Sequence, residues 1–69
     1  MMMYYQYMLK KVHPTLNEYK VCWCDKMVDK GAVITLDGIP GKWEVVKTYH
    51  TPITHDVLVL NRNPNWYSV

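Results

Sequence analysis

Residues 30–49 read KGAVITLDGIPGKWEVVKTY, and this stretch decides the fold. Residues 32–36 and 43–49 are apolar, β-branched and alternating, as in strands of a half-buried sheet. Residues 37–41, DGIPG, lie between them and supply the glycine and proline that are typical of tight turns. The stretch therefore predicts a β-hairpin.

Shorter apolar runs flank this hairpin on both sides. Residues 2–12 are rich in Tyr and Met and predict a strand that ends before Pro14, and residues 19–24 alternate more regularly and predict another. Residues 57–60, VLVL, form a continuous apolar run, which is typical of a strand buried on both faces. Residues 66–69 predict a last short strand or a docked tail.

The length of the chain, 69 residues, suits a single small domain over residues 1–69. Its stability margin is expected to be thin, because a chain of this size buries only about 60% of its unfolded surface. About five short strands separated by turn residues predict an all-β fold. Closing the sheet removes unpaired edges, so we expect a small SH3-like barrel of antiparallel strands.

Charge and hydropathy place the chain among ordinary globular proteins. Its net charge is +2, and 49% of its residues are hydrophobic. No apolar run approaches the length of about 20 residues that a membrane-spanning helix needs. The N-terminal segment lacks the basic start and the small-residue cleavage site of a signal peptide. We therefore expect a cytoplasmic protein without membrane contact.

The hairpin also carries a characteristic pattern of glycines and core residues. It consists of KG at residues 30–31, Gly38, and GKWEV at residues 41–45. This pattern resembles SH3-like small barrels of the KOW type, and residues 20–49 resemble small proteins of tailed phages and prophages. The KOW resemblance implies contact with RNA or protein, and the phage resemblance implies a phage or prophage origin. Together with the small size and near-neutral charge of the chain, this origin leads us to expect a modulator of a host factor.

Two cysteines in one predicted strand raise the question of a metal site. Cys22 and Cys24, with His13, His50 and His55, are residue types that bind zinc, but zinc sites ordinarily use paired CxxC knuckles. Side chains two residues apart on a strand share a face but diverge, which disfavours a disulfide between them. We therefore expect two free cysteines that pack as small hydrophobic residues, with no metal and no other cofactor.

A catalytic set is the next possibility, because His55 and Asp56 are adjacent and a His–Asp pair serves general-base catalysis. In an extended segment, however, adjacent side chains point to opposite faces. A chain this small also offers little concave volume for a substrate. We expect no enzymatic activity.

Aromatic residues are the remaining candidates for function. The chain has six Tyr and three Trp but no Phe, and these two residue types suit surfaces where one end of a ring is buried and the other is wet. Trp23 and Trp43 are expected in the core. The residues expected to contact a partner are Tyr5, Tyr7, His50, His55, Trp66 and Tyr67.

These features together favour a non-catalytic binding module that acts by contact with a partner protein of unknown identity. A nucleic-acid-binding barrel is an alternative, although the basic residues are dispersed and the single arginine, Arg62, disfavours bidentate reading of bases or phosphates. A self-assembling structural component is a further alternative, since an exposed edge strand could pair two copies into a homodimer.

Overall fold

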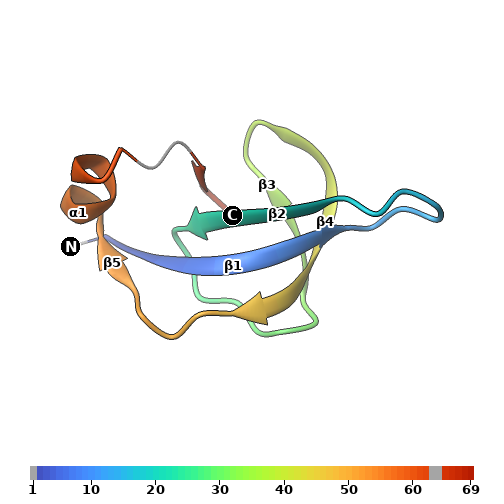
Figure 1. The fold of residues 1–69 in the computed structure, drawn as a ribbon, viewed down its shortest axis with the longest axis horizontal. Coiled ribbons are helices and arrows are strands. Elements are labelled where there is room, and N and C mark those ends of the chain that lie inside the picture. Colours follow the sequence, from blue (N-terminus) through green and yellow to red (C-terminus); the bar gives the residue numbers. More distant parts are fainter. Residues whose placement is uncertain (1, 63–64) are drawn as a thin grey trace.

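The computed structural model describes residues 2–62 and 65–69, which form one sheet of six strands and one short helix (Figure 1). In chain order the elements are β1 (Met3–Lys11), β2 (Tyr19–Cys24), β3 (Val33–Leu36), β4 (Ile39–Thr48), β5 (Ile53–Thr54), α1 (His55–Leu60) and β6 (Trp66–Tyr67). The prediction of a mostly β fold is confirmed, as are the predicted strands at β1, β2 and β6.

Strand β1 lies at the centre of the sheet, since it pairs with β2 on one side and β4 on the other (Figure 1). The strand order is β3-β4-β1-β2-β6, and β5 pairs with the beginning of β1. These pairs are antiparallel except for β2 and β6, which run parallel. The register against β4 shifts between Met8 and Leu9. Met8 faces Lys47 and Leu9 faces Val45, so the extra residue is Val46, and the bulge bends β4 at this point.

The hairpin predicted for residues 30–49 is confirmed as β3 and β4. Leu36 pairs with Ile39, so the turn consists of Asp37 and Gly38 and is shorter than predicted. Gly38 has a φ of 80°, in the left-handed region that glycine adopts without a steric penalty. Asp37, the first residue of the turn, does not have a positive φ, so only the second position needs this geometry, and the Asp-Gly sequence places glycine there.

The main core lies on one face of the bent sheet, where alternate residues of the strands point inward. Its buried members are Tyr7, Leu9, Cys22, Cys24, Ile34, Leu36, Trp43 and Val45. The prediction for Trp43 is confirmed. The prediction that Trp23 is a core residue is wrong, because Trp23 is half-buried and shares the outer face of β2 with exposed Tyr19 and Val21.

The sheet is not closed within the described residues, and the C-terminal tail spans part of the distance between its edges. The N–H of Trp23 donates to the carbonyl oxygen of Asn65 at 2.9 Å. Further along, the N–H of Asp37, at the end of β3, donates to the carbonyl oxygen of Ser68, also at 2.9 Å. The tail therefore pairs with β2 as the short strand β6 and reaches the end of β3 through a backbone hydrogen bond.

The prediction of a buried strand at residues 57–60 is wrong, because this segment belongs to α1. Thr54 caps the helix, and its Oγ1 accepts a hydrogen bond from the N–H of Val57 at 3.3 Å. Asp56 lies in the first turn, where a negative charge is favourable. Leu58 is buried, whereas the apolar residues beside it are exposed. One side of the helix thus packs on the sheet and the rest faces solvent.

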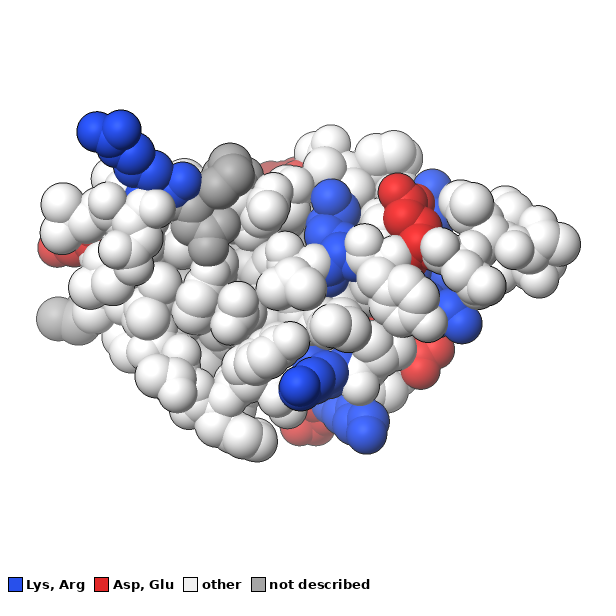
Figure 2. Space-filling model, in the orientation of Figure 1, with Lys and Arg blue, Asp and Glu red and all other residues white. Residues whose placement is uncertain are grey.

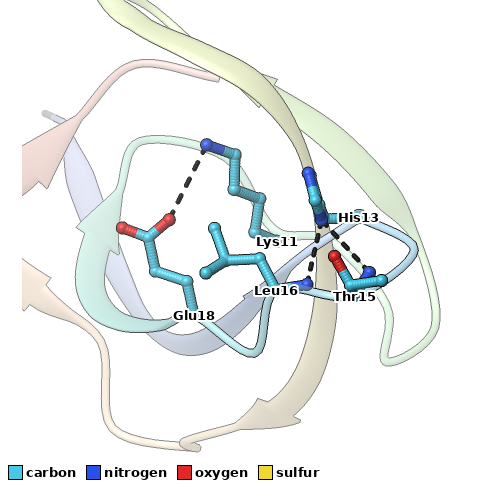
Figure 3. A network of polar contacts seen from close by, with 5 residues as sticks. All are labelled: Lys11, His13, Thr15, Leu16 and Glu18. Carbon is cyan, nitrogen blue, oxygen red and sulfur yellow. Dashed lines mark hydrogen bonds and ion pairs between the residues drawn. The ribbon is translucent and has the colours of Figure 1, made fainter.

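The loop between β1 and β2 projects at the end of the molecule opposite α1 (Figure 1). Its conformation is fixed by His13, whose Nδ1 accepts hydrogen bonds from the N–H groups of Thr15 at 3.2 Å and Leu16 at 2.9 Å (Figure 3). An ion pair of 3.7 Å joins Lys11 to Glu18 at the base of the loop. The imidazole of His13 therefore has a structural role as a turn acceptor.

Candidate partner-binding surfaces

The structure separates the predicted partner-binding residues into three places. Tyr5, Tyr7 and His50 line one pocket, His55 and Trp66 lie in an aromatic cluster beside α1, and Tyr67 packs against the main core. The sequence alone could not show this division, because it depends on which strands are neighbours.

The aromatic cluster consists of Tyr4, His55 and Trp66. The ring of Trp66 stands edge-on to both others, with centroid distances of 5.6 Å to Tyr4 and 5.4 Å to His55. Such edge-to-face contacts are a preferred arrangement of aromatic rings. Tyr4 is buried, while Trp66 is 41% exposed. His55 is the first residue of α1. The cluster is thus anchored inside the protein and open on its outer side.

Sequence reasoning missed Tyr4, because alternation in β1 is weak and adjacent tyrosines obscure it. Tyr4 pairs with Ile53 of β5, directly before α1. Both Tyr4 and Leu58 are buried outside the main core cluster. A small second core therefore lies beneath α1.

Exposed apolar residues gather around the aromatic cluster. Of the eleven large hydrophobic residues exposed in the described part of the chain, five lie at this end, namely Met2, Val57, Val59, Leu60 and Trp66. We call these five residues the α1 end surface. Met2 belongs to it because its carbonyl oxygen accepts a hydrogen bond from the N–H of His55 at 3.3 Å. Val57 and Leu60 are three residues apart and share one side of the helix.

A hollow opens beside this surface and is lined by Met2, Thr54, His55 and Asp56. Within the described residues, Nδ1 of His55 is buried and makes no hydrogen bond. A buried polar atom of this kind carries a desolvation cost, which a donor or acceptor from another molecule would remove.

A separate pocket of about 280 Å³ lies where β1, the loop after β2 and the segment after β4 meet. Tyr5, Tyr7 and Tyr49 line it, and we call it the tyrosine pocket. Apolar lining comes from Met27, Val28 and Pro52, and exposed polar lining comes from Asp29, Lys30 and His50. Residues far apart in the sequence thus meet around one cavity.

Tyr7, one of the residues expected to contact a partner, is only 2% exposed and forms the floor of the pocket. Its hydroxyl accepts a hydrogen bond from the N–H of Val28 at 2.9 Å and donates one to the carbonyl oxygen of Lys26 at 3.0 Å. Burial raises the pKa of Tyr7 above its ordinary value. The role of Tyr7 is to tie the loop after β2 to the central strand.

Tyr67 directly follows Trp66 but does not line the tyrosine pocket or the hollow beside α1. It is half-buried against the main core and pairs with Cys24 across β2 and β6. The ammonium group of Lys20 lies 5.5 Å from the Tyr67 ring centroid and 5.8 Å from that of Trp43. Tyr67 therefore helps to seal the core at the C-terminal tail, a role that the aromatic content of the tail did not reveal.

The two cysteines are free and buried, as expected, but their side chains do not diverge. The Sγ atoms of Cys22 and Cys24 lie 3.6 Å apart and share a hydrogen bond. Turning the thiols together lets one S–H donate to the other sulfur in an otherwise apolar core. The hydrogen bond to Cys22 and burial raise the pKa of Cys24, whereas the hydrogen bond from Cys24 lowers the pKa of Cys22. In the described residues, no group of three or more His, Cys, Asp and Glu could hold a metal ion.

Both thiols are expected to react with a water-soluble aromatic disulfide at least about 100-fold more slowly in the native protein than in urea, because attack requires exposure of the sulfur. Absorbance of the released thiolate measures the rate, and a Cys22→Ser variant reports Cys24 alone. Reaction of either thiol at the unfolded rate in native buffer would contradict the buried geometry.

Basic side chains on the face shown in Figure 2 are scattered among acidic and uncharged ones, without a continuous patch. Binding to nucleic acid by counterion release depends on several clustered Lys and Arg residues. This face therefore does not favour nucleic acid. In the described part of the chain, no helix has the length and apolar character that crossing a membrane requires.

Comparisons with protein-family models, with curated proteins and with solved structures found no match. The KOW-type likeness and the phage origin therefore stay predictions. What this protein does has to be inferred from its own surfaces.

Proposed function

We propose that this protein is a non-catalytic binding module that contacts a partner protein through the α1 end surface. The observation that carries this proposal is the gathering of exposed apolar residues around Trp66, which is itself held by Tyr4 and His55. Contiguous exposed apolar patches mark interaction sites, because leaving them in water is unfavourable. Tryptophan is also among the residues that most often dominate binding energy.

The geometry of the cluster favours tight contact. Edge-on packing against two rings restricts the side chain of Trp66 before any partner arrives, so little rotamer entropy is lost on binding. Exposed Asp56 and Arg62 add charge near the apolar residues. An apolar centre with a polar border is the usual anatomy of a protein interface.

The finer parts of this proposal come from the sequence. They are an SH3-like fold type, a phage or prophage origin, and a host protein in the cytoplasm as the partner. Under this proposal the α1 end surface would bind that host protein and alter its activity without covalent chemistry.

Leu60→Glu is expected to reduce partner binding by at least about tenfold, because it places a charge within the apolar contact. Leu60 is 79% exposed, so the free energy of unfolding should change by less than about 0.5 kcal/mol. Val12→Glu is the matched control, since Val12 is 52% exposed and belongs to the loop between β1 and β2, which projects at the end opposite α1.

The measurement is affinity capture from nuclease-treated lysate, followed by titration of the captured protein against each variant. Retention of the same partner by wild type and Val12→Glu, with loss by Leu60→Glu, supports the proposal. Undiminished binding by Leu60→Glu would overturn it, and capture that nuclease abolishes would indicate nucleic acid instead. Sedimentation of the purified protein tests whether the bound partner is a second copy.

A further inference from the structure

We propose that the tyrosine pocket binds an alkylammonium group, namely a quaternary or methylated amine. This inference is independent of the proposed protein contact, because the pocket shares no lining residue with the α1 end surface. Three tyrosines, Tyr5, Tyr7 and Tyr49, line the pocket together with the acidic residue Asp29. The faces of aromatic rings carry negative charge density and attract cations, and alkylated ammonium groups are recognised in this way.

The volume of the pocket limits what it can hold. At about 280 Å³ it is near the lower end of the range of about 300–1,000 Å³ found for small-molecule sites. A compact group suits this space better than an extended ligand does. Met27, Val28 and Pro52 complete the lining with apolar surface, against which the methyl groups of an alkylated amine can pack.

The walls of the pocket are fixed by bonds to the central sheet. The Tyr7 hydroxyl holds the loop after β2 at Lys26 and Val28, and the N–H of Ala32 donates to the carbonyl oxygen of Asp29 at 3.1 Å. On the other side, the N–H of Tyr49 donates to the carbonyl oxygen of Gln6 at 3.1 Å. These bonds position the chain segments that carry the lining residues before a ligand enters, which lowers the entropy cost of binding.

The chain itself already places a cation against one of these rings. The ammonium nitrogen of Lys47 lies 5.0 Å from the ring centroid of Tyr49, although Lys47 does not line the pocket. Two exposed charges do line it, Asp29 and Lys30, and they act on a bound cation with opposite signs. The pocket takes much of its lining from three tyrosines, and aromatic rings attract cations, so this lining favours a cation as the ligand.

The first test titrates the whole protein with tetramethylammonium and with choline at constant ionic strength, and follows the Met27 methyl and the tyrosine ring signals by NMR. The control ligand is 3,3-dimethylbutan-1-ol, the neutral isostere of choline. We expect saturable shifts with both cations, and affinity for the alcohol lower by at least about fivefold. Equal affinity for the alcohol, or no saturable shift up to about 100 mM cation, would overturn the proposal.

Removing each of the two charges in the pocket gives a second test, because the two variants should change the affinity for choline in opposite directions. Asp29→Asn is expected to weaken choline binding by about threefold, and Lys30→Gln to strengthen it by about threefold, since both charges are near the surface and partly screened. Neither variant should change the affinity for the neutral alcohol. Effects of reversed sign would identify an anion site and overturn the proposal.

Ring variants test the aromatic contact itself. Tyr49→Leu is expected to weaken choline binding by about tenfold, and Tyr49→Phe by less than about twofold, because the phenyl ring keeps its π face. Tyr19→Leu is the matched control, since Tyr19 is 56% exposed outside the pocket and also faces a lysine, with Lys10 Nζ 5.9 Å from its ring centroid. An equal loss in Tyr19→Leu would contradict a site at the pocket.

The ammonium group can belong to a free small molecule or to a modified lysine of a peptide, and two ligands separate these sources. Tighter binding of a trimethyllysine peptide than of choline would identify a modified protein as the source. Binding of choline without binding of the peptide would identify a free amine. Both results support the ammonium chemistry, and failure of both ligands would overturn it.

Discussion

Trp43→Ala is expected to lower the free energy of unfolding by about 3–5 kcal/mol, which is the range for removing a buried aromatic side chain. Trp43 is 2% exposed and is the largest fully buried side chain in the described chain. Single cores of chains below about 70–80 residues rarely supply more than about 3–5 kcal/mol. The substitution is therefore expected to leave most molecules unfolded at room temperature.

The position of Trp43 in the sheet explains why this loss is large. It pairs with Ile34 of β3 and with Lys11 of β1, so its ring lies where three strands meet. The ammonium groups of Lys11 and Lys20 lie 5.9 Å and 5.8 Å from its ring centroid and cover it from solvent. Alanine would leave a cavity bounded by strands, which cannot move together without breaking their hydrogen bonds.

Trp43→Phe is the informative comparison. Nε1 of Trp43 is buried and makes no hydrogen bond within the described residues, so phenylalanine removes an unsatisfied donor as well as some volume. We expect a loss of about 1 kcal/mol for this variant. Urea unfolding followed by circular dichroism measures both substitutions. A midpoint for Trp43→Ala close to that of the wild type would show that the ring is not central to the core.

The part of the fold that could be predicted from the sequence is the part that local chemistry decides. The Asp37-Gly38 turn and the alternation on either side of it specify a hairpin without help from distant residues. The same alternation places Ile34, Trp43 and Val45 in the core. To predict these features it is enough to know that side chains of a strand alternate between two faces and that one turn joins the two strands.

The features that could not be predicted depend on contacts between distant segments or on a competing local signal. In a run of four apolar residues, the spacing of apolar side chains does not distinguish a strand from a helix. Residues 57–60 were therefore compatible with either structure. Thr54, three residues before Val57, was the readable sign of a helix start. The parallel pairing of β6 with β2 has no local signal, because it joins segments about forty residues apart.

The division of the candidate site follows from the pleat of β1. Tyr5 and Tyr7 point to one face and reach the tyrosine pocket, whereas Tyr4 points to the other and packs beneath α1. The sequence identified tyrosines in this strand as candidates but not which face each would serve. Tyr49 joins the pocket because Thr48 pairs with Tyr7, a register that only the folded sheet reveals.

Tyr7→Phe is expected to lower the free energy of unfolding by about 1–3 kcal/mol, although it removes a single oxygen atom. That oxygen serves both the N–H of Val28 and the carbonyl oxygen of Lys26, and both groups would lose their partner. Tyr5→Phe is the matched control, because the Tyr5 hydroxyl holds neither group. Urea unfolding compares the variants, and equal losses in the two would contradict the structural role of the Tyr7 hydroxyl.

The pH dependence of stability gives the same hydroxyl a second signature. The pKa of Tyr7 is raised above its ordinary value of 10.0, mainly because burial disfavours the phenolate. The folded state therefore holds this proton more tightly than the unfolded state does, so the stabilisation is complete below the unfolded pKa. This stabilisation is lost as the pH rises from the pKa of Tyr7 in the unfolded state through its higher pKa in the folded state.

Unfolding measured at about pH 8 and about pH 11 should therefore show a smaller drop in stability for Tyr7→Phe than for the wild type or Tyr5→Phe. Release of the loop is visible separately, because the amide of Val28 loses its acceptor in Tyr7→Phe and should exchange with solvent faster than in Tyr5→Phe. Since the same loop forms one wall of the tyrosine pocket, Tyr7→Phe should also weaken choline binding while the core stays folded. Unchanged exchange at Val28 in this variant would mean that other contacts hold the loop, and the pocket would then not depend on Tyr7 for its shape.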